Sequence, residues 1–492
     1  MLGAVIVLIL LSPSRTSEAQ LTTADARKSA LEHRDRREFG PAIALLRVVV
    51  ASPEGTAEDE IILAETLAWN NELDESVRRY RALLDGPLPP PRARLGLARA
   101  LLWSGRYAEA RRQFQAAEGV EALEGGATAA YWQGDYTTAL REFRRVLAKD
   151  PARELARKSV TEIEAAMRPT QRIEATATRD DQPFHAALAG VAATGFADPL
   201  TRWDLSAGTW RLHRPFDGRT STAPRITAGV ERAFPWQRLT LSASAGAIRL
   251  PAGQTEPIGS IVLTLRAGRS AISAAAGQRE ILTNPAEKYA MVRSTTLEWK
   301  REDASGRSAA VHLERLQYED RNRGTLAYAY GIVPIVRHDR FGIWAGLSAA
   351  HRDTDDARFF EISVSSSRLP SGQFRYTYRG LYIPYWTPVD LTEGRGIIGG
   401  ELKWPGGGAL RAQLDGGQAR DKGIAFAPGA GAEPLPATIV PFAFERVYEP
   451  FRARLDLTTR PIAGFSLRAG YEYSRTIDYQ ARTIHASLVR QR

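Results

Sequence analysis

Apolar side chains follow a helical spacing in the N-terminal part of the chain and a strict alternation in the rest. Between residues 23 and about 165, apolar residues recur three or four positions apart, which places them on one face of a helix. From Gln171 onward, apolar and polar residues alternate, which is typical of strands with one apolar and one polar face. The pattern predicts an α + β multidomain protein with its helices first.

The helical part contains an internal repeat. Units of about 34 residues begin at Thr23, Ala57 and Pro91, and a shorter step leads to a fourth unit at Val120. Each unit has a small residue where its two helices cross, because a larger side chain would push the helices apart. These residues are Ala30, Ala64, Ala98 and Ala127 on the first helix and Ala42, Ser76, Ala110 and Ala139 on the second. The positions resemble those of tetratricopeptide repeats, and we expect an α-helical solenoid of about four such repeats in residues 20–168.

A tryptophan recurs at the thirteenth position of three units. These residues are Trp69, Trp103 and Trp132, whereas the first unit has Asp35 at that position. In one interpretation, each indole packs beneath the turn into the second helix. In the other, the three indoles form a ladder along the concave groove, a location that the tetratricopeptide resemblance implies, and stack on the rings of a passing sugar chain.

The alternating part extends over residues 169–492 without a helical interruption. We count about sixteen to eighteen candidate strands, which favours a transmembrane antiparallel β-barrel of about 16 strands over a soluble β-sandwich or propeller. A closed barrel leaves no unpaired strand edge in lipid, and at this strand number the interior is too wide for side chains to fill. Aromatic residues near predicted strand ends, including Trp203 and Tyr318, are candidates for the interfacial girdles.

The polar faces of the predicted strands are rich in arginine. The candidate lumen-lining residues are Arg375, Arg379, Arg452, Arg454 and Arg468, which alternate with apolar side chains. Guanidinium groups bind sugar hydroxyls and carboxylates, and their charge keeps a lumen hydrated. The sequence therefore predicts a pore of mixed charge in which arginine is prominent.

Composition and the N-terminus restrict the class of protein further. The apolar run from Leu2 to Leu11 suits a signal peptide over residues 1–19, and a short N-terminal anchor is the alternative. No later stretch is long and apolar enough for a membrane-spanning helix. The chain has no cysteine, which is ordinary in the bacterial cell envelope and excludes thiolate metal ligands. The net charge of +10 comes from arginines spread along the chain, which argues against a nucleic-acid-binding arm.

The residues that carry enzymatic chemistry form no recognisable constellation. The seven histidines are scattered, and the chain has no HExxH, GxSxG or P-loop motif. The acidic stretch 351–358 lacks the glycine and the spacing of a calcium loop. An outer-membrane hydrolase or lipid-modifying enzyme therefore finds no support, and we expect no enzyme activity, cofactor or metal.

A segment between two prolines supplies the last motif. In residues 380–394, Tyr385, Trp386, Thr387 and Pro388 follow Pro384, and two prolines break a strand ladder, so this segment is predicted to be a loop or strand end. Together with a signal peptide and the repeats, it resembles the bacterial exopolysaccharide export porins, above all the cellulose synthase operon protein C family. That family has a Tyr-aromatic-Ser-Pro motif, and Thr387 stands in the serine position here. The poly-N-acetylglucosamine exporter and YaiO-type outer-membrane proteins are more distant resemblances.

The resemblance implies a function. The barrel would pass an exopolysaccharide through the outer membrane, and the periplasmic repeats would guide the polymer or dock periplasmic or inner-membrane synthase components. The expected partners are therefore outer-membrane lipid, a polysaccharide chain and the synthesis machinery, with no nucleic acid. The alternative is a structural or assembly protein of the YaiO type, whose repeats bind a protein partner while the barrel serves as an anchor.

Overall fold

The structure, a computed structural model, describes residues 22–181, 184–215, 218–282, 291–358, 360–361, 364–368, 374–378, 381–382, 385–428, 439–477 and 479–491. It describes no side chains in residues 360–382 and 423–443. The chain divides into two compact units, Met1–Val160 and Thr161–Arg492. The predicted signal peptide, residues 1–19, lies outside the described residues.

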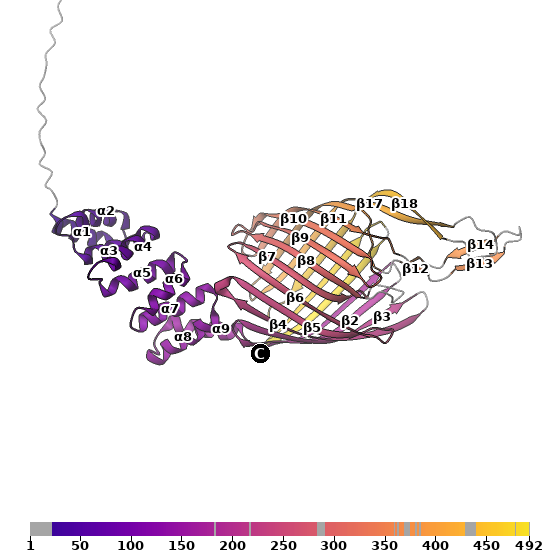
Figure 1. The fold of residues 1–492 in the computed structure, drawn as a ribbon, viewed down its shortest axis with the longest axis horizontal. Coiled ribbons are helices and arrows are strands. Elements are labelled where there is room, and N and C mark those ends of the chain that lie inside the picture. The colour runs from indigo at the N-terminus through magenta and orange to yellow at the C-terminus, as the bar shows by residue number, and fades with distance from the viewer. Residues whose placement is uncertain are drawn as a thin grey trace, which may run out of the picture. The chain divides into compact units, whose positions relative to one another are not determined.

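The first unit consists of consecutive helix pairs (Figure 1). The pairs are α1 (Thr23–Asp35) and α2 (Phe39–Ala51), α3 (Ala57–Trp69) and α4 (Leu73–Asp85), α5 (Pro91–Trp103) and α6 (Tyr107–Gln115), and α7 (Val120–Gln133) and α8 (Tyr136–Lys149). The next helix, α9 (Glu154–Ala166), crosses the division between the two units. The first helix of every pair begins at the residue where the sequence predicts a repeat to begin, so the repeat prediction is confirmed. None of the helices in the described residues is long and apolar enough to cross a membrane.

Small side chains and local caps explain why these segments form helix pairs. The alanines at the predicted crossing positions, such as Ala30 and Ala98, have no exposed surface. Ser76, the one polar residue at such a position, donates its buried hydroxyl to the Ala64 carbonyl at 2.7 Å and so avoids an unsatisfied buried donor. Thr56 caps α3 through a capping box, and Pro91 occupies the first turn of α5.

Ion pairs connect one repeat with the next. Arg47 pairs with Glu75 at 2.7 Å, and Arg81 pairs with Glu109 at 2.8 Å, in the same two positions of successive units. The contact with the most buried carboxylate joins α1 to α3. There Arg27 donates from Nε and Nη2 to the two carboxylate oxygens of Asp59, at 2.7 and 2.9 Å, and the Asp59 side chain is 3% exposed. Asp59 is also the acidic member of the capping box, so one carboxylate stabilises both a helix end and a repeat interface.

The second unit is an antiparallel barrel (Figure 1). Its wall strands are β1 (Thr170–Asp180), β2 (His185–Asp198), β3 (Thr201–Arg214), β4 (Arg219–Phe234), β5 (Leu239–Arg249), β6 (Thr255–Ala267), β7 (Ser270–Glu280), β8 (Met291–Glu302), β9 (Ser308–Tyr318), β10 (Arg323–Arg337), β11 (Phe341–Thr354), β16 (Leu391–Trp404), β17 (Gly408–Pro428), β19 (Phe451–Thr458), β20 (Phe465–Arg475) and β21 (Gln480–Gln491). These 16 strands close into a ring because β1 pairs with both β2 and β21. The predicted fold class is confirmed.

The remaining strands lie beyond the ring of the wall. β18 (Ile439–Tyr448) pairs with the second half of β17. Two small sheets, β12 (Phe360–Glu361) with β15 (Leu381–Tyr382) and β13 (Val364–Arg368) with β14 (Phe374–Tyr378), belong to the connection between β11 and β16. The strand predicted around Arg375 is thus part of a hairpin and not of the barrel wall. Alternation alone does not distinguish these two locations, because both give a strand two different faces.

The two faces of the barrel wall differ in chemistry. One face carries exposed apolar side chains, for example Ile173 on β1, Leu263 on β6 and Leu347 on β11. The other face carries polar side chains that contact one another across strands, such as Ser206 with Thr227 and Thr264 with Ser273. In a closed barrel, the apolar face is the outer surface and the polar face surrounds the lumen. A closed barrel with an apolar outer surface is the architecture of outer-membrane barrels.

The two ends of the barrel also differ. At one end the strands are joined by short turns, such as Gly268-Arg269 between β6 and β7, where Gly268 adopts a positive φ of 58°. The connections at the other end include the three longest, residues 281–290, 355–390 and 429–438. β1 begins and β21 ends at the end with short turns. Tyr318, expected in an outer girdle, instead faces the lumen, because it lies on the same side of β9 as His312 and Glu314.

We predict that Asp59 gives the helical unit a stability that depends on pH. The hydrogen bond from Arg27 lowers the pKa of Asp59 to about 2. Because the folded-state pKa lies below the unfolded value, the stabilisation, about 2 kcal/mol, is fully present above about pH 4 and is lost as the pH falls toward 2. Asp59→Asn should therefore lower the free energy of unfolding at neutral pH, and the deficit should shrink over this pH window.

Denaturant unfolding of the full chain, followed by the helical circular dichroism signal, measures the effect. Asp74→Asn is the matched control, because Asp74 is an exposed acidic residue in the first turn of α4. If the unfolding free energies of the two variants depended on pH in the same way, Asp59 would not be the source of the pH-dependent stabilisation.

Candidate functional sites in the barrel and the repeats

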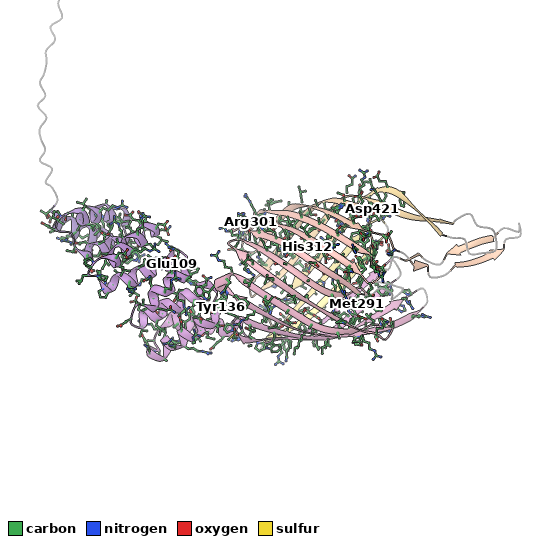
Figure 2. All side chains as sticks on the ribbon, viewed as in Figure 1. Glu109, Tyr136, Met291, Arg301, His312 and Asp421 are labelled. Carbon is green, nitrogen blue, oxygen red and sulfur yellow. The ribbon has the colours of Figure 1, made fainter. Side chains whose placement is uncertain are left out.

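Charged and aromatic side chains gather on the lumen face of one side of the barrel. Strands β8 to β19 bring them together, since successive strands present every second residue to the same face. They line a cavity of about 320 Å³ and include Glu298, His312, Tyr328, Tyr330, Arg352, Glu393, Arg395 and Arg452. Figure 2 shows His312 between the two ends of the barrel, which are marked by Arg301 and Asp421. The cluster is therefore part of the lumen wall between the two mouths.

Arginine–carboxylate pairs hold this cluster in place. Arg395 pairs with Glu393 at 2.8 Å, and Arg452 pairs with Asp415 at 2.7 Å. The side chains of Glu393 and Asp415 are 8% and 3% exposed, so each buried carboxylate has a guanidinium partner, as burial of charge requires. The Nε atoms of Arg352 and Arg395 are buried without a hydrogen-bond partner among the described residues.

The arginines predicted from the sequence fall into two groups. Arg452, Arg454 and Arg468 lie on the polar face, opposite Asp415, Gln413 and Thr458 on the neighbouring strands. Arg454 also pairs with Asp456 at 2.8 Å. Arg375 lies in β14, outside the barrel wall, and its side chain and the whole of Arg379 lie outside the described residues.

Sequence reasoning missed the arginines at the centre of the cluster. Arg352 and Arg395 come from β11 and β16, whose polar faces also contain glycine, alanine and serine, so the alternation of charge is interrupted there. A usable signal was the pair Glu393 and Arg395, two oppositely charged residues on the same face of one strand. Asp415 was not recognisable, because its partner Arg452 is distant in the sequence.

The Tyr385–Pro388 segment packs against the lumen side of the wall. Tyr385 is buried, stacks on Tyr318 of β9 with ring centroids 3.8 Å apart, and donates its hydroxyl to Asp320 at 2.6 Å. The guanidinium of Arg352 lies over the ring of Trp386, and the guanidinium carbon is 4.3 Å from the ring centroid. This segment is outside the barrel strands, in agreement with the effect expected of its two prolines.

Further hydrogen bonds fix the same segment. The Thr387 hydroxyl accepts from the Arg358 backbone at 3.2 Å, and the Thr354 hydroxyl donates to the Pro388 carbonyl at 2.8 Å. Burial and the hydrogen bond to Asp320 raise the pKa of Tyr385, so its phenol stays protonated and keeps donating at neutral pH. The segment and the wall around Arg352 line a second cavity of about 250 Å³.

The three repeat tryptophans occupy equivalent half-exposed positions. The exposed fractions are 43% for Trp69, 45% for Trp103 and 49% for Trp132. Each ends or nearly ends the first helix of its pair. Trp69 contacts Phe39, the first residue of α2, with ring centroids 5.9 Å apart, and Trp132 contacts Tyr107, the first residue of α6, at 6.2 Å. One side of these two indoles is therefore packed against the preceding repeat, and much of each indole remains accessible.

Trp69 and Trp103 share a recess of about 160 Å³. Its other lining residues are Glu65, Ala68, Tyr80, Gly96 and Arg99. Gly96 allows Tyr80 to pack directly against α5, because a Cβ at this position would overlap the Tyr80 ring. Gly125 stands in the same relation to Phe114 one repeat later. The recess combines two indoles with a carboxylate and a guanidinium, a combination that suits a sugar ring or a polar peptide.

The described residues contain no group of three or more histidine or acidic side chains arranged to hold a metal ion. His312 lies 3.5 Å from Glu298 and 4.0 Å from Glu314, and the rest of its surroundings are aromatic and arginine side chains. The cluster thus offers hydrogen-bond donors and acceptors along a wall.

Comparisons with known proteins concern the shape of the chain. No protein-family model matches it, and no curated protein matches it. Among solved structures, it is similar to a bacterial polysaccharide outer membrane secretin, with a TM-score of 0.48 and 10% identity over 66% of this chain and 99% of that one. It is similar to OmpTdeltaL8, an outer membrane protein of Vibrio cholerae, with a TM-score of 0.33 and 10% identity over 65% and 98%.

The helical unit has its own counterpart. A tetratricopeptide repeat protein from Parabacteroides merdae is similar over 30% of this chain and 59% of that one, with a TM-score of 0.27 and 15% identity. At these identities and TM-scores, the similarities carry no argument about the function of this chain.

Proposed function

We propose that this protein is an outer-membrane conduit for the export of an exopolysaccharide. The observation that carries the proposal is the lumen wall, where Arg352, Arg395 and Arg452 stand beside carboxylates and tyrosines around one cavity. Such a wall exchanges hydrogen bonds with sugar hydroxyls as readily as with water, so a hydrated polymer slides along it without a deep energy minimum. The apolar outer surface supplies the membrane anchor.

The termini of the barrel support a periplasmic location for the repeats. Outer-membrane barrels have short turns on the periplasmic side and longer loops outside. β1 begins at Thr170 and β21 ends at Gln491, both at the end with short turns. The repeats are joined to β1 through residues 167–169, so they lie in the periplasm, where a polymer emerging from a synthase first meets this protein.

The repeat recess fits the same role. Half-exposed indoles at Trp69 and Trp103 present flat apolar faces, and Glu65 and Arg99 lie beside them. Stacking at one such position contributes roughly 0.5–1.5 kcal/mol, by analogy with aromatic pairs. An interaction of this strength holds a chain near the barrel and still releases it.

A second candidate function has its own support. Apolar side chains, including Leu212, Ile248 and Ile258, form a buried cluster on the lumen face near the end with long connections. They pack together with Phe184 and Met291 and fill part of the lumen. That packing favours a structural or assembly protein whose repeats bind a protein partner while the barrel serves as an anchor.

Complementation of a deletion strain separates the two functions. Secreted carbohydrate should fall on deletion and return with the full chain, and a chain carrying Arg452→Gln, Arg454→Gln and Arg468→Gln should restore it incompletely. Suppose that this variant restores secretion fully and that secretion still depends on the repeats. That result would support the second function, in which the repeats bind a protein partner. Unchanged secretion after deletion would end the export proposal.

We predict that the same three substitutions change the ion selectivity of the pore. Removing positive charge from the lumen face should shift the reversal potential of the purified full chain in planar bilayers toward cation selectivity. Arg490→Gln is the control, since Arg490 is exposed on the outward face of β21. An equal shift in the control, or none in the triple variant, would mean that the arginines do not line the conducting path.

We also predict that the indoles contribute more to ligand contact than to folding. Because Trp103 is half exposed, Trp103→Ala should cost about 1–2 kcal/mol of unfolding free energy, whereas Phe143→Ala, at a side chain 1% exposed, should cost about 3–5. Trp103→Ala should also weaken the tryptophan fluorescence change caused by short β-linked glucose or N-acetylglucosamine oligomers. A cost equal to that of Phe143→Ala, with no sugar response in the parent protein, would assign the indoles to packing.

A further inference from the structure

Arginines recur on the outer surface of the barrel at the end with long connections, on strands from β20 through the seam to β10. Eight are exposed, lie on the outward face of their strands, and stand within three residues of the strand end. We call them the arginine collar: Arg179, Arg211, Arg249, Arg293, Arg315, Arg323, Arg475 and Arg482. They come from β1, β3, β5, β8, β9, β10, β20 and β21, so the collar extends over both sides of the seam where the barrel closes.

Strand alternation places the collar directly beside the apolar band. Arg179 is on the same face of β1 as Ile173, which is 61% exposed. Arg293 shares its face of β8 with Leu297, and Arg315 shares its face of β9 with Leu313. Each strand thus presents apolar side chains along the membrane and then a guanidinium at its border. This arrangement matches a lipid, which has acyl chains next to a polar headgroup.

The seam brings two arginines of the collar face to face. Arg179 stands directly opposite Arg482 in the pairing of β1 with β21. Like charges in this position repel and destabilise a sheet unless a counter-charge lies between them. Neither arginine has an ion pair with any of the described residues.

One arginine of the collar, Arg293, also lines a recess at this end of the barrel. Arg293 and Arg321 line a cavity of about 280 Å³, whose other lining residues are Gln278, Gln317, Glu256, Glu319, Met291, Val292 and the lumen-facing Tyr318. Arg293 donates from Nε to the Gln278 side chain at 2.9 Å, which holds the guanidinium plane in one orientation. A fixed guanidinium is well suited to bind two oxygens of a phosphate.

We propose that the arginine collar binds the phosphate groups of anionic lipids in the membrane leaflet at this end of the barrel. The acyl chains of those lipids lie on the apolar band, and their phosphates bridge arginines of neighbouring strands, including Arg179 and Arg482. The collar therefore fixes the depth of the barrel in the membrane and neutralises the repulsion at the seam. This inference requires a membrane-spanning barrel and is independent of what the lumen transports.

The test measures lipid binding to the purified full chain in a nonionic detergent. The probe is bis-phosphorylated lipid A, compared with its dephosphorylated form, and bound lipid is counted by native mass spectrometry. Arg179→Gln with Arg482→Gln should weaken binding of the phosphorylated lipid by roughly thirtyfold, since each basic residue near a lipid surface contributes about a factor of five. The dephosphorylated lipid should bind equally to both proteins.

The control variant is Arg301→Gln. Arg301 is exposed on the same face of β8 as Arg293, and Figure 2 shows it towards the opposite end of the barrel from Met291. Its substitution should leave lipid binding unchanged. A heat-modifiable gel mobility identifies folded barrel in every variant, and Arg211→Gln with Arg249→Gln replaces the seam variant if that one does not fold.

Two results would overturn the proposal. Equal binding of phosphorylated lipid A by the collar variants and the parent would show that the collar makes no lipid contact. Displacement of the lipid by millimolar inorganic phosphate would show that the collar binds a soluble anion and not a membrane lipid. Loss of binding in the collar variants alone, without competition by phosphate, is the expected result.

Discussion

The fold of the second unit depends on the pairing of β1 with β21. Without it, the backbone N–H and C=O groups of two edge strands would face hydrocarbon, at a cost of several kcal/mol for each unsatisfied group. The register runs from Thr170 opposite Gln491 to Asp180 opposite Ala481, so closure involves the whole of β1. It joins residues more than 300 positions apart, as in the contact of Thr178 with Thr483. Every other feature of the barrel requires this ring to be complete.

Closure of the ring gives the two faces of every wall strand different surroundings. Once the ring exists, one set of alternate residues must face lipid and the other must face the lumen, so a single pattern determines the apolar band, the polar wall and the arginine collar. The same rule explains why Arg452 contacts Asp415 from the next strand and why Tyr318 faces inward to meet Tyr385. The function that we propose uses the inner face, and the lipid contact uses the outer one.

Local sequence patterns predicted the helices and strands, but they did not predict the contacts between residues distant in the sequence. The repeat starts at Thr23, Ala57, Pro91 and Val120 follow from small residues that only close helix crossing explains, and the structure agrees at each of them. The alternation predicted a barrel of about the observed strand number. By contrast, the contact of Tyr385 with Asp320 joins residues 65 positions apart, and the β13–β14 hairpin alternates just as a wall strand does. Both depend on the path of the chain outside regular pairing, which no local period encodes.

The most direct test of this account is a disulfide across the seam. The chain has no cysteine, so Ala175→Cys with Ala486→Cys introduces the one possible pair, at residues that face each other in the register. Oxidation should cross-link this variant in heat-modifiable protein. Ala175→Cys with Ala469→Cys should not cross-link, since Ala469 is the partner of Ala486 on the far side of β21. The closed barrel, on which the proposed conduit depends, would be contradicted by either of two results in folded protein. One is failure of the disulfide between positions 175 and 486 to form, and the other is formation of the control disulfide instead.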